Sequence, residues 1–255
     1  MQPKKRQLME TESIAILAVL IFTAALLYSS VGHAGASGYL AAMALFGMAP
    51  LTMKPAALTL NILVAAITTT KYLRAGRFSW PLFWPLALAS IPFAYAGGLI
   101  TLPGAYYKPI VGAVLIYAAY RFVRDAGKPD YTVKPPMLPV VLLCGAGLGF
   151  LSGLVGVGGG IFLSPLLIMM QWEAVKKVSG ISAAFILVNS IAGLLGFVAS
   201  KAPQLPDGLP YWAAAAVLGG YIGAEYGSKR FGNPTIKRLL SMVLLVAGVK
   251  MIATA

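Results

Sequence analysis

The sequence predicts an all-α integral membrane protein, a polytopic bundle of eight to ten transmembrane segments that form two internal repeats with helices broken at glycines. Of its 255 residues, 59% are hydrophobic and only 11% are charged, whereas a soluble domain usually carries about 25% charged residues. Uncharged stretches of about 20 residues or more, long enough to cross a bilayer, recur along the chain. Glycine-rich segments interrupt two of these stretches at corresponding places.

In the first half, helices are expected where apolar stretches lie between Pro, Gly or charged residues. The first stretch is longer than the apolar part of a signal peptide, so we predict a retained helix. A glycine-rich segment and a short apolar piece follow it. Pro55 suits the first turn of the next helix, because proline has no N–H to lose there. The predicted elements are Ser13–Val31, Tyr39–Leu51, Pro55–Tyr72, Trp80–Ile100 and Tyr106–Phe122.

The second half repeats this plan after a polar linker that contains prolines. Its predicted elements are Met137–Leu154, Ile161–Trp172, Val178–Ser200, Tyr211–Tyr226 and Ile236–Ile252. Because the two halves match in the same order, we predict an internal duplication, which is common in transporters. The chain is then one membrane domain, residues 1–255, divided into repeat 1 (13–124), a linker (125–136) and repeat 2 (137–255).

The relative orientation of the repeats depends on whether each short apolar piece crosses the membrane. Four crossings per half make the repeats parallel, and five make them inverted. Lys and Arg are enriched in the cytoplasmic loops of membrane proteins, but their distribution here does not separate the two arrangements. We favour inverted repeats.

The net charge of +13 has two interpretations. Basic proteins often bind nucleic acid, but no basic motif lies beside an aromatic platform in this sequence. Lys and Arg flank the hydrophobic segments, where they contact the phosphates of membrane lipids. We therefore expect membrane lipids and no nucleic acid as partners, and a homo-oligomer is left open.

Two glycine-rich segments are the main functional signal. Ser152–Pro165 reads SGLVGVGGGIFLSP, and a degenerate copy, Ser30–Gly38, lies in the first half. Each interior glycine costs a helix about 1 kcal/mol relative to alanine, so regular helix is not expected there. In hydrocarbon, a broken helix survives only where protein or a water-filled cavity covers its backbone. The segments therefore predict two interrupted helices inside the membrane.

A helix that begins inside the membrane offers a site for an anion. Its first turn presents unpaired N–H donors and a partial positive charge, and glycine lets a ligand approach the backbone. The alternative is that the small residues only allow close helix packing. Substrate contacts are expected at three positions in each segment: Gly158, Gly159, Gly160, Ala36, Ser37 and Gly38.

Uncharged polar residues in the spans are candidates for supporting contacts to the substrate. Asn61 and Asn189 occupy corresponding positions in the two halves, and an amide can donate to an oxyanion. The alternative for both is a hydrogen bond between helices. Ser182 is a weaker candidate of the same kind.

Two ionisable residues are candidates for proton coupling. His33, the single histidine, lies in the first glycine-rich segment, and its alternative role is packing. Glu225 lies near a helix end, and its alternative role is an ion pair with Lys229 or Arg230. No cofactor, metal site or catalytic set is expected from one His, one Cys and seven acidic residues, so we predict no enzyme.

Several motifs resemble the TauE/SafE family of sulfite-exporter-like membrane transporters. Gly156-Val-Gly-Gly-Gly160, followed by Pro165-Leu-Leu167 and a helix that bears Asn and Ser, is similar to that family, as are the basic turn Lys71–Arg77 and the segment Gly219–Gly227. The first half departs from the family's Gly-x-Gly-Gly-Gly, since it has Ala34-Gly-Ala-Ser-Gly38. The resemblance implies a multi-pass transporter of the bacterial inner membrane for small sulfur-containing anions such as sulfite, thiosulfate or organosulfonates, often an exporter.

The residues and the resemblance together predict a secondary transporter with alternating access around a central anion site. A passive channel for anions or small solutes is the closest alternative, and an intramembrane enzyme is a more distant one.

Overall fold

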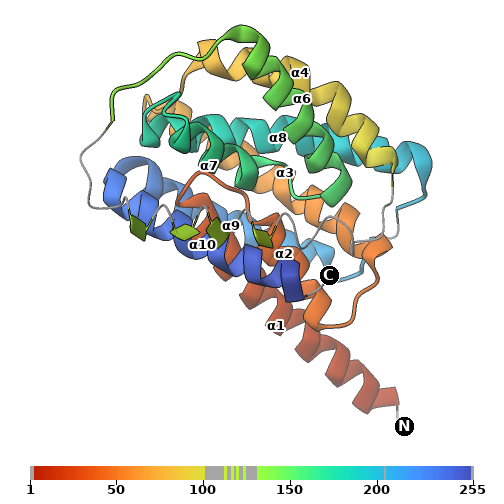
Figure 1. Cartoon of the computed structure of the whole chain (residues 1–255). Coiled ribbons are helices and arrows are strands. Elements are labelled where there is room, and N and C mark those ends of the chain that lie inside the picture. The colour runs from red at the N-terminus through yellow and green to blue at the C-terminus, as the bar shows by residue number, and fades with distance from the viewer. Residues whose placement is uncertain are drawn as a thin grey trace.

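The chain folds into a bundle of helices in a computed structural model (Figure 1). The structure describes residues 3–100, 112–113, 116–117, 119–120, 123–124, 131–203 and 205–253, and contains no strand among them. Most of the predicted helix Tyr106–Phe122 lies outside these residues. The described helices are α1 (Pro3–Ser29), α2 (Ala36–Leu45), α3 (Pro50–Arg74), α4 (Trp80–Leu99), α6 (Leu138–Val155), α7 (Gly160–Met169), α8 (Val175–Ser200), α9 (Leu209–Lys229) and α10 (Asn233–Ala253).

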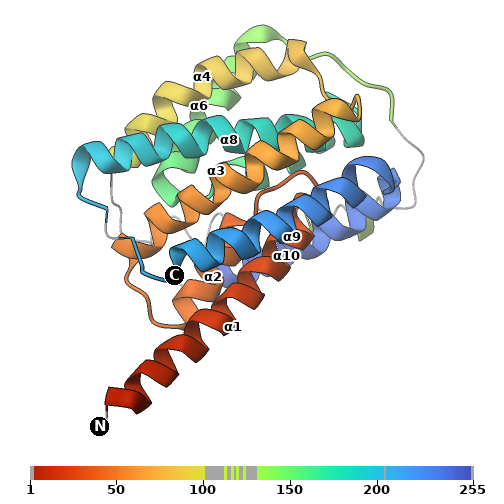
Figure 2. The ribbon, with the colours of Figure 1, turned by 180° about the vertical axis from the view of Figure 1, so that it is seen from behind.

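The all-α membrane fold predicted from the sequence is confirmed. Five described helices are long and apolar enough to cross a membrane, namely α1, α3, α4, α6 and α8. The helices α2 and α7 have 10 residues each, about 15 Å, which is half of the hydrocarbon thickness. Figures 1 and 2 show α3 and α8 between a layer of α4 and α6 and a layer of α1, α9 and α10.

Two predicted boundaries in the first half are wrong. The short piece was expected to continue to Leu51, but α2 ends at Leu45, because Gly47 takes a left-handed conformation (φ +68°) and the N–H of Met48 closes the turn on the carbonyl of Met43. The next helix was expected to begin at Pro55, but α3 begins at Pro50.

Pro55 is tolerated inside α3 for a physical reason. A proline near a helix start removes one backbone hydrogen bond. The three following residues, Ala56, Ala57 and Leu58, are fully buried, so their packing offsets this loss. The earlier start places Lys54 in the helix, where the sequence pattern had left it outside.

Contacts between neighbouring helices fix the directions of α1, α9 and α3. Near the start of α9, Trp212 Nε1 donates to the carbonyl of Ile14 in α1 (3.2 Å), and near the end of α9, Gly227 lies against the carbonyl of the later Ser30. These two helices are therefore parallel. The helix α3 runs the same way, since Lys71 near its end pairs with Glu225 near the end of α9.

The other three long helices run in the opposite direction. In α8, Ser190 contacts Asn61 of α3 while the earlier Gly180 contacts the later Tyr72, so α8 is antiparallel to α3. The helix α4 is parallel to α8, because Tyr95 near its end lies against Gly196 near the end of α8. The helix α6 is parallel to α4 through the contacts described below.

These directions bear on the predicted repeats. In that scheme α1 corresponds to α6, α3 to α8 and α4 to α9, and the two members of each pair run in opposite directions. This is the arrangement of inverted repeats, which many transporters share. The duplication itself stays a prediction.

Glycine stripes bring two helix pairs into backbone contact. On α6, Gly145, Gly149 and Gly153 recur every fourth residue and face the carbonyls of α4, and a Cβ on Gly153 would lie 2.0 Å from the carbonyl oxygen of Ala94. On α9, a Cβ on Gly227 would lie 2.0 Å from the carbonyl oxygen of Ser30. Small residues of this kind let membrane helices approach closely.

We expect Gly153→Val to lower the free energy of unfolding by about 1–3 kcal/mol or more, because the side chain has no space against α4. Gly147→Val on the same helix is the matched control, since nothing lies within 4 Å of a Cβ at that position, and its effect should stay within about 0.5 kcal/mol. Thermal unfolding of the detergent-solubilised protein measures both. Equal stability of the two variants would contradict the proposed packing.

Candidate functional site

Both predicted helix breaks are present in the structure. The first joins Ser29 at the end of α1 to Ala36 at the start of α2, and the second joins Val155 at the end of α6 to Gly160 at the start of α7. All residues in 31–37 and 156–160 are buried. Their irregular backbone is therefore covered by protein, as the apolar surroundings of a membrane require.

The second break consists of glycines in conformations that other residues rarely adopt. Gly156, Gly158 and Gly159 have φ values of +76°, +79° and +79°. Within the described structure, the N–H groups of Gly158, Gly159 and Gly160 donate to no protein acceptor. Ser152 lies beside them, since its Oγ would be 3.3 Å from a Cβ on Gly159, and this hydroxyl is buried without a protein partner. The half-helix α7 thus begins with free donors directed into the protein interior.

His33 joins the two breaks. Its Nε2–H donates to the carbonyl of Gly160 (2.9 Å), and the Oγ of Ser164 lies 3.1 Å from the same nitrogen. Ser164 Oγ in turn lies 2.7 Å from Ser182 Oγ of α8. Because a carbonyl oxygen only accepts, Nε2 carries the proton, and Nδ1 is buried with no protein partner.

The first turn of α2 belongs to the same cluster. Ser37 Oγ donates to the hydroxyl of Tyr28 (2.8 Å), and the ring of Tyr28 packs edge-on against His33 at 6.5 Å between centroids. Among the expected site residues, the structure therefore brings His33, Ser37, Gly160 and Ser182 together. The sequence reasoning missed two members of the cluster, Tyr28 and Ser164. Ser164 could have been predicted, because it lies one helical turn after Gly160 and therefore on the same face of the helix.

Asn61 holds the second break in place. Its Nδ2 donates to the carbonyl of Val157 (3.3 Å) and to Ser190 Oγ (3.3 Å), and it would lie 2.9 Å from a Cβ on Gly158. Asn189 instead donates to the carbonyl of Phe185 (2.8 Å) in its own helix. Both amide groups thus donate to protein, and the unpartnered atom of each is the oxygen. The two bonds of Asn61 use both of its amide hydrogens, whereas Asn189 keeps one amide hydrogen for a ligand.

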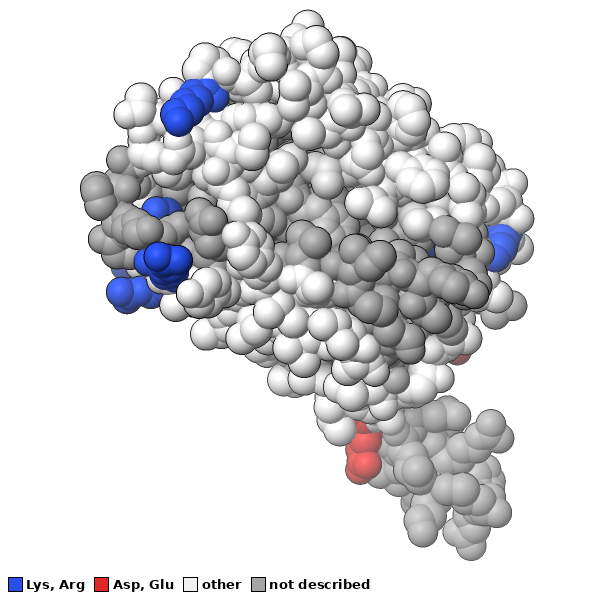
Figure 3. Space-filling view, viewed as in Figure 1, with Lys and Arg blue, Asp and Glu red and all other residues white. Residues whose placement is uncertain are grey.

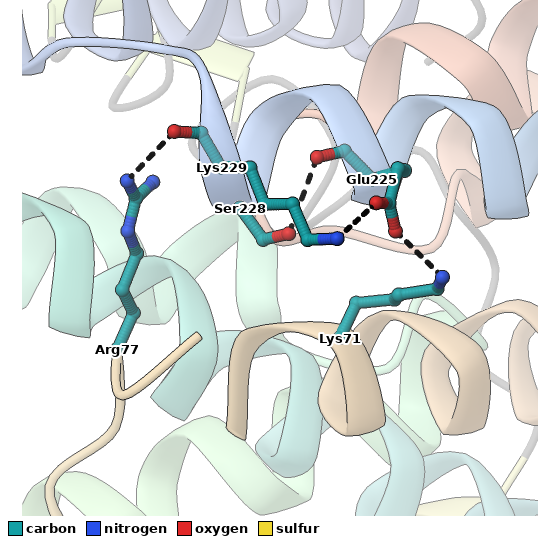
Figure 4. Close-up of polar contacts among 5 residues, drawn as sticks. All are labelled: Lys71, Arg77, Glu225, Ser228 and Lys229. Carbon is teal, nitrogen blue, oxygen red and sulfur yellow. Dashed lines mark hydrogen bonds and ion pairs between the residues drawn. The ribbon is translucent and has the colours of Figure 1, made fainter. Parts of the chain in front are cut away.

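Two of the expected residues have other roles in this conformation. Gly38, in the first turn of α2, packs against α1, because a Cβ there would lie 2.7 Å from the Cβ of Ala24. Glu225 forms ion pairs with Lys229, the alternative considered above, and with Lys71 of α3 at 2.6 Å (Figure 4). The pair with Lys71 was not foreseen, since it joins residues that are far apart in the sequence.

The turn after α3 caps the end of α9. Arg77 donates through Nη1 to the carbonyl of Gly227 (2.9 Å). Its Nη2 donates to the carbonyl of Lys229 (3.4 Å), as Figure 4 shows. Cations at a helix C-terminus interact favourably with its partial negative charge. Basic residues therefore gather where α3 and α9 end and α8 begins, and we call this the basic end: Lys71, Arg74, Arg77, Lys176, Lys177, Lys229 and Arg230. In Figure 3 most of the visible Lys and Arg atoms lie at this end, on the left.

The comparisons with known proteins agree with a transporter. The family described as Sulfite exporter TauE/SafE matches residues 17–251. A probable membrane transporter protein of Sinorhizobium fredii is 41% identical over 248 residues, 96% of this chain and 100% of that protein. A probable membrane transporter protein of Methanocaldococcus jannaschii is 27% identical over 196 residues, 73% of each chain. No solved structure matches.

We expect Asn61→Leu to cost more stability than Asn189→Leu. The first change leaves the buried carbonyl of Val157 without its donor, which costs about 1–3 kcal/mol. The second removes a bond to a carbonyl of the same helix, so its cost should stay below about 1 kcal/mol. Thermal unfolding of both variants tests this order. A larger loss for Asn189→Leu would show that Asn61 does not hold the break.

Proposed function

The chain belongs to the sulfite exporter TauE/SafE family, and from this premise we propose that it is a secondary transporter that exports a small sulfur-containing anion: sulfite, thiosulfate or an organosulfonate. That the chain is a multi-pass membrane transporter follows from the family, the relatives and the apolar helices. The substrate, the direction and the alternating-access mechanism are the proposal. A place in a bacterial inner membrane agrees with the relative from Sinorhizobium fredii.

One observation carries the proposal: two half-helices begin at the same buried cluster. The first residues of α2 and α7 are Ala36 and Gly160, and His33 connects the two starts through its bond to Gly160. A helix N-terminus carries a partial positive charge of about half an elementary charge. Two such ends directed at one place favour an anion between them, as in other transporters with broken helices.

The groups around the cluster suit a sulfur oxyanion. Sulfite, thiosulfate and sulfonates present several acceptor oxygens around one sulfur. The free N–H groups of Gly158–Gly160, the hydroxyls of Ser152 and Ser164, and His33 Nδ1 when protonated are donors that match them. Hydrogen bonds to a charged group contribute about 1.5–3 kcal/mol each, so a few of them hold the anion and still allow its release, which a transport cycle requires.

The helix directions support alternating access. Inverted repeats allow the two halves of a transporter to tilt against each other around a shared site, and corresponding helices of opposite direction are what such repeats have. The basic end is assigned to the cytoplasm, because Lys and Arg are enriched in the loops on that side of membrane proteins. Export then moves the anion from the basic end to the opposite end.

Transport in reconstituted vesicles tests the proposal. We expect saturable uptake of radiolabelled sulfite, and faster uptake into vesicles preloaded with unlabelled sulfite or thiosulfate, because a site that alternates between two sides exchanges its ligand. Vesicles without protein are the control. Flux that rises linearly with concentration and shows no stimulation from the other side would indicate a passive channel.

The pH dependence of transport tests the role of His33. We expect uptake of an alkanesulfonate, which stays anionic throughout, to rise as the pH falls from about 6 to 4, because burial disfavours the imidazolium until the solution is acidic and a protonated His33 then offers its Nδ1–H to the anion. His33→Ala should flatten this profile. Glu225→Gln should keep it, since Glu225 already pairs with Lys71 and Lys229 away from the breaks. If only the Glu225 variant lost the pH dependence of uptake, Glu225 and not His33 would be the proton-coupling residue.

A further inference from the structure

We propose that Lys54 is a substrate-binding cation, whose ammonium group holds the transported anion at the second helix break, at the end of the molecule opposite to the basic end. The inference rests on the proposed function and adds to it a residue that no sequence motif indicated. It also gives the cluster at the breaks a full positive charge, which hydroxyl and backbone donors lack.

The position of Lys54 is the first argument. Lys54 lies in the apolar span Leu51–Arg74 of α3, and its side chain crosses to the second break. A Cβ on Gly156 would lie 2.8 Å from Lys54 Cγ, and Lys54 Nζ donates to the carbonyl of Leu154 in the last turn of α6 (3.2 Å). The absence of a side chain at Gly156 is therefore what admits the lysine to the break. An ionisable residue inside a membrane span usually belongs to a functional site.

The charge around Lys54 is the second argument. Its described contacts include no carboxylate: besides Leu154 they are the ring of Phe197, 5.6 Å from Nζ to the centroid, and the like charge of Lys201. A half-buried ammonium beside a second cation is unfavourable in apolar surroundings. The bond to Leu154 uses one of three ammonium hydrogens, so two are left for a ligand. An anion at this place would give the Lys54 ammonium group the counter-charge that its described contacts lack.

Lysine contacts occur at both breaks. Lys250 of α10 donates through Nζ to the carbonyl of Ser37 at the start of α2 (2.9 Å). Each break thus receives a lysine from the other half of the chain. A lysine at the end of α6 is also a favourable helix cap, which would explain Lys54 alone. Capping does not explain Lys250, because Ser37 lies at a helix start.

Binding measurements on charge variants test the inference. For sulfite titrated into the purified full-length protein, we expect Lys54→Met to weaken affinity by about tenfold or more, because a charge-assisted hydrogen bond is lost. Lys54→Arg should stay within about threefold of the wild type, since the cation remains. Lys177→Met is the matched control: this exposed lysine lies at the basic end, and its loss should leave affinity unchanged.

The outcomes separate the possible roles of Lys54. Wild-type affinity in Lys54→Met, with or without a lower melting temperature, would overturn the inference and leave Lys54 as a helix cap. Loss of affinity in Lys54→Arg as well would show that a positive charge at this position is not sufficient, and would contradict the role assigned to the charge. If the wild type neither binds nor transports sulfite, thiosulfate or a sulfonate, the proposed function itself fails.

A second measurement uses the wild type and does not depend on the folding of a variant. Amine acetylation followed by mass spectrometry reports the accessibility of each lysine. We expect saturating sulfite to slow the modification of Lys54 at least about threefold relative to Lys177, which serves as the internal standard for reagent consumption. An unchanged ratio would contradict contact between Lys54 and the anion.

Discussion

The structure depends on one constraint: in a membrane, every backbone N–H and C=O needs a partner, because no water is available in the hydrocarbon. An uninterrupted helix meets this constraint with its own backbone hydrogen bonds, whereas the two interrupted helices cannot do so at their breaks. The chain buries both breaks and supplies donors to carbonyls at them, with Asn61 on Val157, Lys54 on Leu154, His33 on Gly160 and Lys250 on Ser37. Asn61, Lys54 and Lys250 come from other helices and His33 comes from the other break, so the breaks also tie the bundle together. The N–H groups that remain free at the start of α7 are the ones available to a ligand.

Glycine has two separate roles in this bundle. In the second break it provides left-handed backbone at Gly156, Gly158 and Gly159. On the regular faces of α6 and α9 it provides space for a neighbouring backbone, as at Gly153 and Gly227. From the sequence, the alternatives for the glycine-rich segments were an anion site and close helix packing. The structure places the glycines with left-handed backbone and the packing glycines at different positions.

Charge is distributed unevenly along the bundle. At the basic end, cations pair with Glu225 or cap the end of α9. At the opposite end, Lys54 meets a backbone carbonyl, an aromatic ring and another lysine. Cations at the basic end therefore pair with a carboxylate or with helix-end carbonyls, whereas Lys54 has no carboxylate among its described contacts and lies beside a helix break. An ammonium group without a carboxylate partner keeps hydrogen-bonding capacity for a ligand.

The sequence by itself determined the membrane class, the helical plan and the two glycine breaks, because hydropathy and glycine content act locally and leave a signal in consecutive residues. It also indicated His33, Ser37, Gly160 and Ser182, which meet in the structure. Only the tertiary structure decided the directions of the helices and the partners Tyr28, Ser164 and Lys71. The sequence did not place Lys54 in a helix, because Pro55 predicted a later start for α3. In the structure, buried packing extends that helix to Pro50. Contacts between distant segments depend on how whole helices pack, and no pattern of neighbouring residues records that.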